Sequence, residues 1–139
     1  MSEDRTRALI QVATQARLQS VAPFSRFLVG AAVRAENGKI YAGCNVESAS
    51  YGLTVCAERV AIWKALSEGE RHFTEIAVVA DTDSLTPPCG TCRQIIWEFA
   101  KSAIIVLANL HGEVEVVSIT ELLPRAFDAR FLQEAKGQK

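Results

Sequence analysis

The stretch "EIAVVADTDSLTPPCGTCRQIIWEFAKSAIIVLA", residues 75–108, decides the fold. It begins and ends with short, nearly continuous apolar runs, 75–80 and 103–108, which are typical of strands buried on both faces of a sheet. A helix is predicted to follow Pro88, over about Cys89 to Ala100, because proline suits a first helical turn. A strand, a helix and a second strand in this order predict an α/β sheet.

The sequence before this stretch adds two helices and two strands. Residues 4–19 carry alanine, valine and leucine at helical spacing. The apolar segments 27–35 and 39–46 flank Asn37-Gly38, a strong signal for a β-hairpin. A further helix is predicted from about Val55 to Glu68, with the glycine at 69 as its stop signal.

The sequence after residue 108 predicts one more strand and a short helix. "NLHG" (109–112) turns the chain into the alternating "EVEVVS" (113–118), and "SITE" (118–121) resembles a capping box. "NLHG" is too short for a parallel crossover, so the last two strands should be antiparallel. We therefore predict a single domain over residues 1–139, a three-layer α/β/α sandwich with a mixed five-stranded sheet and helices on both faces.

Composition limits the kind of protein and its location. The chain has 139 residues, of which 49% are hydrophobic and 22% charged, as expected for one globular domain. Its net charge of −1 and its scattered lysines and arginines predict no nucleic-acid partner. No apolar run is long enough for a membrane helix or a signal peptide, so we expect a cytoplasmic protein without a membrane partner. Four cysteines in a reducing compartment indicate metal binding or catalysis more than disulfides.

Two short motifs place three cysteines at predicted helix starts. "VCAERV" (55–60) holds Cys56, and "PPCGTCRQ" (87–94) holds Cys89 and Cys92. If the strands that precede the two helices are neighbours, both helix starts meet at one end of the sheet, where open α/β sheets bind ligands. Three converging thiolates would bind zinc and leave its fourth position for water, which is the catalytic pattern.

A closed structural zinc site with a fourth cysteine is the alternative. Cys44, at the end of a predicted strand, is the candidate, although a lone cysteine in a strand is most often a small core residue. His72 and His111 lie in predicted surface turns without the spacing of ligands. The open site formed by three cysteines is the favoured interpretation.

Glu58 and Arg59 indicate what an open site would do. A glutamate in a first helical turn often only complements the helix dipole, but beside zinc-activated water it can transfer protons. Three thiolates outweigh Zn²⁺ by one negative charge. The Arg59 guanidinium, near the metal ligands, would offset that charge, although a solvated helix residue is its simpler interpretation.

These motifs resemble the zinc nucleoside deaminases. The blocks "SRFLVGAAV", "GKIYAGCNVESASYGLTVCAERVA", "PPCGTCRQIIWEF" and "ELLPRAF" are together similar to the small, homotetrameric cytidine deaminases over about residues 22–127. The zinc motif alone is moderately specific, whereas four blocks in order are very specific. The resemblance implies a cytidine deaminase-like fold, one zinc ion per chain, a nucleoside substrate, a role in pyrimidine salvage and a homotetramer with shared active sites.

The resemblance also implies a role for individual residues. Cys56, Cys89 and Cys92 match the zinc ligands, and Glu58 matches the proton shuttle. Phe27 matches an aromatic residue that lines the pyrimidine pocket, and Asn45 and Glu47 match the side chains that hold the ribose 3′-hydroxyl. The backbone at Ala57 and around Pro87 matches the part of the pocket that faces the base edge. Phe127 matches an aromatic residue that enters a neighbouring subunit's pocket. Simpler interpretations are a core position for Phe27 or Phe127 and turn or surface positions for Asn45 and Glu47.

Four positions depart from the family pattern. Ser48 replaces a usual asparagine, Phe24 a usual tyrosine, Pro87 a small polar residue and Arg125 a common glycine. None of the four is a proposed ligand or the shuttle. Pro87 and Arg125 border the expected pocket, so they bear on substrate breadth and subunit packing.

The expected reaction is hydrolytic deamination of cytidine and 2′-deoxycytidine with release of ammonia. Two alternatives stay open. One is a zinc deaminase of another aminopyrimidine or of a nucleoside antibiotic, although "CNVE" (44–47) favours a ribose-bearing substrate. The other is a non-catalytic binding module that zinc stabilises.

Overall fold

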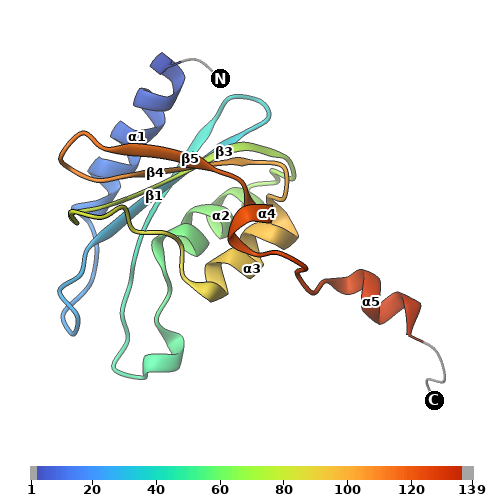
Figure 1. Cartoon of the computed structure of the whole chain (residues 1–139). Helices are drawn as coiled ribbons and strands as arrows, with labels where there is room; N and C mark the ends of the chain where they lie inside the picture. Colours follow the sequence, from blue (N-terminus) through green and yellow to red (C-terminus); the bar gives the residue numbers. More distant parts are fainter. Residues whose placement is uncertain (1–2, 136–139) are drawn as a thin grey trace.

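One mixed sheet organises the chain, whose computed structural model describes residues 3–135 (Figure 1). The strand order is β2-β1-β3-β4-β5. The strands are β1 (Val29–Ala35), β2 (Ile40–Cys44), β3 (Phe73–Ala80), β4 (Ile104–Ala108) and β5 (Val114–Val117). β3 and β4 are parallel, and the other three neighbouring pairs are antiparallel. The mixed five-stranded sheet with antiparallel final strands is therefore confirmed.

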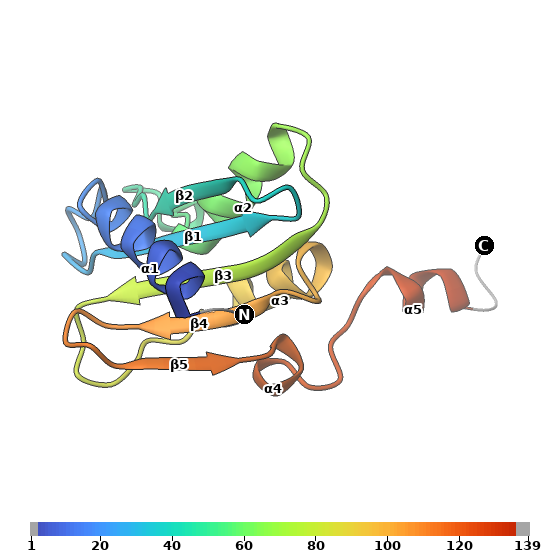
Figure 2. The same cartoon turned by 90° about the horizontal axis from the view of Figure 1, so that it is seen from above.

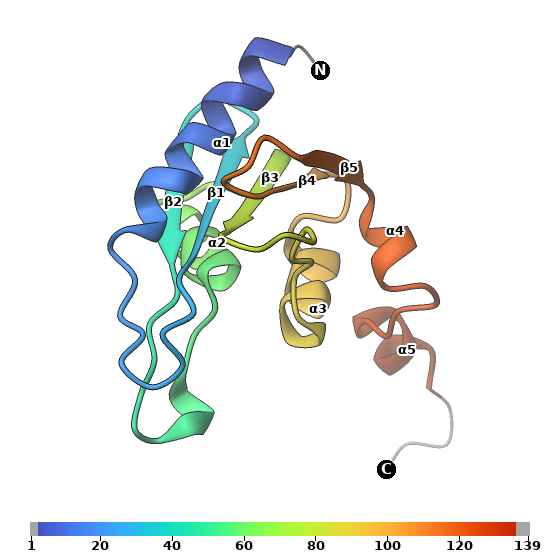
Figure 3. The ribbon, with the colours of Figure 1, turned by 60° about the vertical axis from the view of Figure 1, so that its left-hand side comes forward.

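Helices cover both faces of this sheet, as predicted (Figure 3). The larger helices are α1 (Glu3–Arg17), α2 (Ala57–Ser67) and α3 (Gly90–Phe99). The shorter ones are α4 (Ile119–Leu122), α5 (Ala129–Glu134) and a 3₁₀ turn, η1 (Tyr51–Leu53). α1 packs on one face, and α2 and α3 pack on the other.

Two apolar clusters fill the space between these layers. On the face covered by α2 and α3, the largest fully buried side chains are those of Ile62, Ile76, Ile96, Ile105 and Ile119. On the other face, α1 buries its own side chains against three strands; the cluster there is Leu9, Ala13, Ala32, Ala77, Val79, Val106 and Ala108. Because β1 and most of β3 are buried on both faces, their sequences are apolar without alternation.

The start of α2 lies unusually close to β2. A Cβ atom added at Gly43 would lie 2.5 Å from the carbonyl oxygen of Ala57 and 2.5 Å from the backbone nitrogen of Ala61. Only a residue without a side chain allows this approach. Gly43 therefore sets the distance between the sheet and the helix that carries Glu58.

Local signals in the sequence coincide with the observed turns and helix ends. Gly38 in the β1–β2 hairpin and Gly69 after α2 have φ angles of 92° and 99°, which glycine adopts at little cost. The predicted capping box is present, since the Glu121 side chain accepts a hydrogen bond of 3.1 Å from the Ser118 backbone N–H. Pro88 lies just before the N-cap residue of α3 rather than inside its first turn, so that helix begins one residue later than predicted.

The segment after β5 is attached to α3 and then leaves the body of the molecule. Three α3 side chains hold it: Arg93 donates to the Leu122 carbonyl (2.9 Å), Gln94 to the Phe127 carbonyl (2.8 Å) and Trp97 to the Asp128 carboxylate (3.1 Å). α5, which the sequence analysis did not predict, projects away from the sheet (Figure 2). No helix within residues 3–135 has the length and apolar character needed to cross a membrane.

Candidate active site and metal centre

The N-termini of α2 and α3 meet at one end of the sheet. The strands that precede these helices, β2 and β3, are not neighbours as the prediction assumed, because β1 lies between them. β1 is antiparallel to both, so β2 and β3 run in the same direction. The two helices therefore still begin at the same end of the sheet.

The predicted metal ligands gather at these helix starts. Cys56 is the N-cap residue of α2, Cys89 is the N-cap residue of α3, and Cys92 lies in the first turn of α3. Their three sulfur atoms lie within 4.8 Å of one another. No fourth histidine, cysteine or acidic side chain from residues 3–135 joins this group, and Cys44 is not part of it.

The spacing of the sulfur atoms suits zinc. The Sγ atoms of Cys56 and Cys89 are 3.6 Å apart. Two sulfur ligands at tetrahedral angles, each about 2.3 Å from Zn²⁺, would be about 3.8 Å apart. This pair, together with the Cys92 sulfur within 4.8 Å of both, fits a zinc ion with one position left for another ligand.

The surroundings of Cys56 stabilise a thiolate, the form that binds metals. A hydrogen bond from the Cys92 thiol lowers the pKa of Cys56 well below its ordinary value, and Arg59 and Cys89 act in the same direction. The Arg59 guanidinium lies 3.7 Å from the Cys56 sulfur and also donates to the Thr54 carbonyl at 3.3 Å. Arg59 is thus placed beside the sulfur cluster, where its positive charge offsets thiolate charge.

Glu58 is buried next to the cysteines. It is the second residue of α2, and only 4% of its surface is exposed. Burial raises the pKa of Glu58 to about 7, and the negative charge of Cys56 acts in the same direction. A carboxyl group with this pKa can both accept and release a proton near neutral pH.

A cavity of about 220 Å³ opens onto Glu58 and the sulfur cluster. Eight of the residues predicted from the sequence line it: Phe27, Asn45, Glu47, Cys56, Ala57, Glu58, Pro87 and Cys89. Thr86 and Pro87, from the segment between β3 and α3, form another part of the wall. The lining is mainly apolar, with a few polar groups, as is usual for small-molecule sites.

Asn45 and Glu47 hold the segment that carries Phe27. The Asn45 amide accepts a hydrogen bond from the Val29 N–H (2.9 Å) and donates one to the Phe27 carbonyl (2.7 Å). One Glu47 oxygen accepts from the backbone N–H groups of residues 24 and 25, both at 3.0 Å, and the other accepts from the Ser25 hydroxyl. These hydrogen bonds, that of the hydroxyl first, lower the pKa of Glu47. Asn45 keeps one N–H and Glu47 keeps free lone pairs for a ligand.

Ser25 is a pocket residue that the sequence analysis missed. Its hydroxyl donates to Glu47 and accepts from the Phe27 backbone N–H at 3.0 Å. It therefore links the Glu47 carboxylate to the backbone of Phe27. Serine is common in turns, so only the spatial arrangement reveals this link.

Phe127 lies outside the cavity of its own chain. Its side chain is 58% exposed and stacks on Phe131 of α5, with ring centroids 5.8 Å apart. It belongs to neither buried cluster, so the simple alternative of a core position does not describe it.

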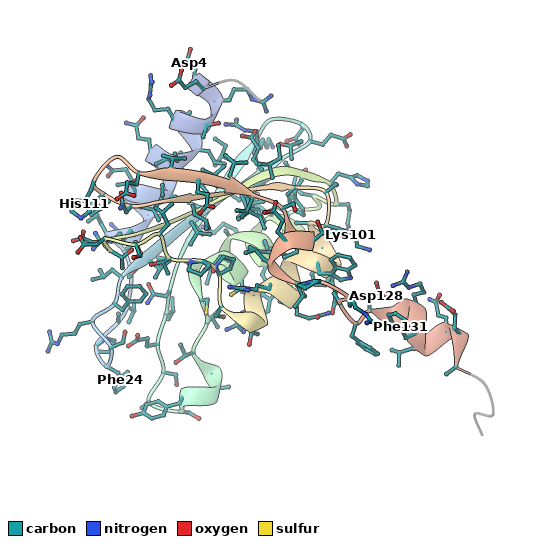
Figure 4. The ribbon with its side chains drawn as sticks, in the orientation of Figure 1. Asp4, Phe24, Lys101, His111, Asp128 and Phe131 are labelled. Carbon is teal, nitrogen blue, oxygen red and sulfur yellow. The ribbon has the colours of Figure 1, made fainter. Side chains whose placement is uncertain are left out.

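The positions that depart from the family pattern have separate surroundings. Phe24 lies at an exposed end of the molecule (Figure 4), where it packs edge-on against Tyr51. The Ser48 hydroxyl accepts a hydrogen bond from the Ser50 N–H. Pro87 lines the cavity. Arg125 has a φ angle of 55°, a left-handed conformation that favours glycine.

Comparisons with known proteins agree with this geometry. The family described as "Cytidine and deoxycytidylate deaminase zinc-binding region" matches residues 3–108. A cytidine deaminase from Sporosarcina psychrophila is 47% identical over 131 residues, which cover 94% of this chain and 96% of that protein. The crystal structure of a cytidine deaminase from Burkholderia pseudomallei superposes with a TM-score of 0.86 at 47% identity, covering 91% of this chain and all of that one.

A more distant relative is named for a different substrate. A blasticidin-S deaminase from Bacillus cereus is 32% identical over 124 residues, which cover 84% of this chain and 87% of that protein. The family match over residues 3–108 includes both cysteine motifs, and the three relatives each cover at least 84% of this chain. The chain belongs to the cytidine and deoxycytidylate deaminase family, whose zinc-binding region includes its Cys56, Cys89 and Cys92 cluster.

Proposed function

We propose that this protein catalyses the hydrolytic deamination of cytidine and 2′-deoxycytidine to uridine and 2′-deoxyuridine, with release of ammonia. One observation carries the proposal: a buried glutamate, Glu58, shares a cavity of about 220 Å³ with two of three clustered cysteines. The cysteines fit zinc, and the cavity gives a substrate access to the carboxyl group. Family membership and the 47% identity to a cytidine deaminase support the same reaction.

Glu58 performs the proton transfers in this proposal. Cys56, Cys89 and Cys92 would hold a zinc ion, which would supply the Lewis acidity that makes water a nucleophile at neutral pH. Glu58 accepts a proton from the attacking water and delivers it to N3 of the pyrimidine, which makes C4 electrophilic. The water oxygen adds to C4. Glu58 then transfers the second proton to the 4-amino group, which leaves as ammonia, so one water is consumed for each ammonia released.

The cavity walls orient the nucleoside. Phe27 covers the base, and the backbone at Ala57 and near Pro87 faces the polar base edge. The unused N–H of Asn45 and the free lone pairs of Glu47 bind the ribose 3′-hydroxyl. Because these contacts address the 3′-hydroxyl, 2′-deoxycytidine is accepted as well.

We further propose a homotetramer whose active sites are shared between chains. Two loops project beyond the start of α2 (Figure 3). The segments 18–28 and 45–56 carry exposed apolar side chains, of which Phe27 also lines the cavity; they are Val21, Phe24, Phe27, Val46, Tyr51 and Leu53. The segment after β5 carries a second exposed group, Phe127, Phe131 and Leu132. Apolar patches of this kind are typical of protein–protein contacts, and Phe127 covers the cavity of a neighbouring chain in this proposal.

We also propose a location and a pathway for this protein. A cluster of reduced thiols is compatible with the cytoplasm, and all four cysteines are free. We therefore place the protein there, as a single domain that converts cytosine nucleosides for pyrimidine salvage.

The decisive experiment is the absorbance change when the purified protein is mixed with cytidine, with and without a chelator. A chelator-sensitive change with stoichiometric ammonia supports the proposal. The similarity to a blasticidin-S deaminase makes nucleoside antibiotics the second candidate substrates, and a panel that includes blasticidin S separates the two. Absence of ammonia release from every cytosine compound would instead support a non-catalytic zinc module.

A further inference from the structure

Asn109 is a buried polar residue outside the active site. It follows β4 directly, and only 5% of its surface is exposed. It lies at the β4–β5 turn, at the end of the sheet marked by His111 in Figure 4. Buried amide groups require partners, and those of Asn109 connect two separate parts of the chain.

One side of the Asn109 amide shapes its own turn. The Oδ1 atom accepts hydrogen bonds from the backbone N–H groups of His111 (2.9 Å) and Glu113 (3.1 Å). The Asn109 backbone N–H also donates to the Glu113 carbonyl at 3.3 Å. An asparagine that folds a turn in this way is common.

The other side of the amide reaches a different segment. The Nδ2 atom donates to the carbonyl oxygens of Thr82 (3.0 Å) and Asp83 (3.3 Å). These residues begin the segment 81–88 between β3 and α3, which has no helix or strand of its own. Nearby, the His111 imidazole lies 3.0 Å from the Asp81 carboxylate, on the surface of the same junction.

Segment 81–88 forms one wall of the active-site cavity. The hydroxyl groups of Thr82 and Thr86 are 2.9 Å apart and hydrogen-bonded. Thr86 and Pro87 line the cavity, and the segment leads directly into Cys89. A chain of contacts thus runs from Asn109 through Thr82 to the wall that faces the substrate.

We propose that Asn109 is a positioning residue for the active site: its amide N–H groups fix segment 81–88 and thereby place Thr86 and Pro87 against the base. An irregular segment without this tether would sample several backbone conformations. The far end is fixed separately, because the Arg93 side chain donates to the Pro88 carbonyl at 2.8 Å. Asn109 therefore holds the part of the segment that begins at Thr82 and Asp83. Loss of its amide should weaken substrate binding more than it slows proton transfer by Glu58.

The variant Asn109→Asp separates the two roles of this side chain. A carboxylate keeps the acceptor for the amides of His111 and Glu113 but cannot donate to Thr82 and Asp83. Asn37→Asp is the matched control. Asn37 also accepts within its own turn, from the Lys39 N–H, and donates across to Glu70, but it lies in the β1–β2 hairpin at the opposite end of the sheet.

The test compares both variants with the wild type by amide hydrogen exchange, zinc content, thermal unfolding and steady-state kinetics with cytidine. In Asn109→Asp we expect about tenfold faster exchange over residues 82–86 and an unchanged zinc content. We also expect a KM raised by about 10- to 100-fold with a much smaller change in kcat, since small displacements of binding groups have effects of this size. Asn37→Asp should leave exchange in this segment and KM at wild-type values.

Several results of this test would contradict the proposed role of Asn109. Unchanged exchange in segment 81–88, a KM within twofold of the wild type, or equal effects in Asn37→Asp would each overturn the proposal. If Asn109→Asp does not fold, Asn109→Ser takes its place, because it also removes the amide N–H groups that donate to Thr82 and Asp83; a KM within twofold of the wild type in that variant overturns the proposal instead. The kinetic part rests on the proposed function. If the wild-type protein does not deaminate cytidine, that function fails and hydrogen exchange alone decides the role of Asn109.

Discussion

The sulfur atoms of Cys56 and Cys89 lie 3.6 Å apart, although 33 residues separate them in the sequence. Each residue is the N-cap of its helix, so the two helix starts and the two sulfur atoms occupy one place. The positive ends of two helix dipoles favour negative charge at this point. The fold thus prepares a site for thiolates before any metal binds.

Loss of any one ligand should remove the metal. In Cys89→Ser and Cys92→Ser we expect zinc to fall from about one ion per chain to near zero, because two thiolates bind zinc much more weakly than three. Cys44→Ser is the matched control and should retain its zinc. Metal analysis of carefully purified protein measures both. Zinc loss from the Cys44 variant would return that residue to the ligand set.

Replacement of Glu58 should abolish catalysis and preserve the fold. Glu58→Gln should lower kcat by about 10²- to 10⁴-fold, because the amide cannot accept a proton from water. Zinc content and melting temperature should not fall, since burial already disfavours the charged form of this residue. Glu68→Gln, at the exposed end of the same helix, is the control and should stay fully active. A Glu58 variant within a few-fold of the wild type would remove this residue from the mechanism.

Shared active sites should permit complementation between inactive chains. When Glu58→Gln and Phe127→Ala chains are mixed and allowed to exchange, some cavities should receive both intact residues and regain activity. The control mixture is Glu58→Gln with Cys92→Ser. Each of its cavities takes Glu58 and Cys92 from one chain, so no activity should return. Sedimentation should show a tetramer, and a fully active monomer would end the shared-site proposal.

Arg125 should be a point where glycine stabilises the chain. At a φ angle of 55° a side chain is strained by about 1 kcal/mol, so Arg125→Gly should raise the free energy of unfolding by up to that amount. Arg125→Lys keeps the strain and serves as the control. Chemical denaturation measures both variants. A glycine variant less stable than the lysine variant would show that the arginine side chain makes contacts that outweigh the strain.

Tyr41 and Glu70 should make stability depend on pH. The Tyr41 hydroxyl donates to the Glu70 carboxylate at 2.6 Å, and this contact lowers the pKa of Glu70. A carboxyl group with a lowered pKa in the folded state stabilises the protein above its unfolded pKa, and the stabilisation is lost as pH falls through the folded value. Tyr41→Phe should therefore be less stable than the wild type at neutral pH, with a difference that narrows in acid. Melting curves between neutral pH and about pH 3 test this, and a constant difference would contradict it.

The sequence predicted the layers of the fold because apolar periodicity is a local property. The apolar runs at 75–80 and 103–108 are typical of buried strands, and Asn37-Gly38 is a strong signal for a tight turn. The place of β1 between β2 and β3 was not predictable in this way. It depends on packing between segments that are distant in the sequence, and periodicity does not report such packing.

The candidate site was predicted unevenly for the same reason. Cysteine spacing located the metal centre, since side chains that start two helices come together whenever the helices do. Ser25 and Asn109 gave no signal, because serine and asparagine are ordinary turn residues until their long-range hydrogen bonds are seen. The contacts of Asn45 and Glu47 with residues 24–29 were also invisible in the sequence.

The close contact between Gly43 and the start of α2 affects how a mutational scan of this protein should be interpreted. Any side chain at position 43 would push away the helix turn that carries Cys56 and Glu58. A screen scored by activity alone would therefore rank Gly43 beside the chemical residues, although glycine has no group that could bind or react. Loss of activity on substitution at position 43 would reflect the short distance between β2 and α2. Only the backbone structure distinguishes this packing requirement from a catalytic role.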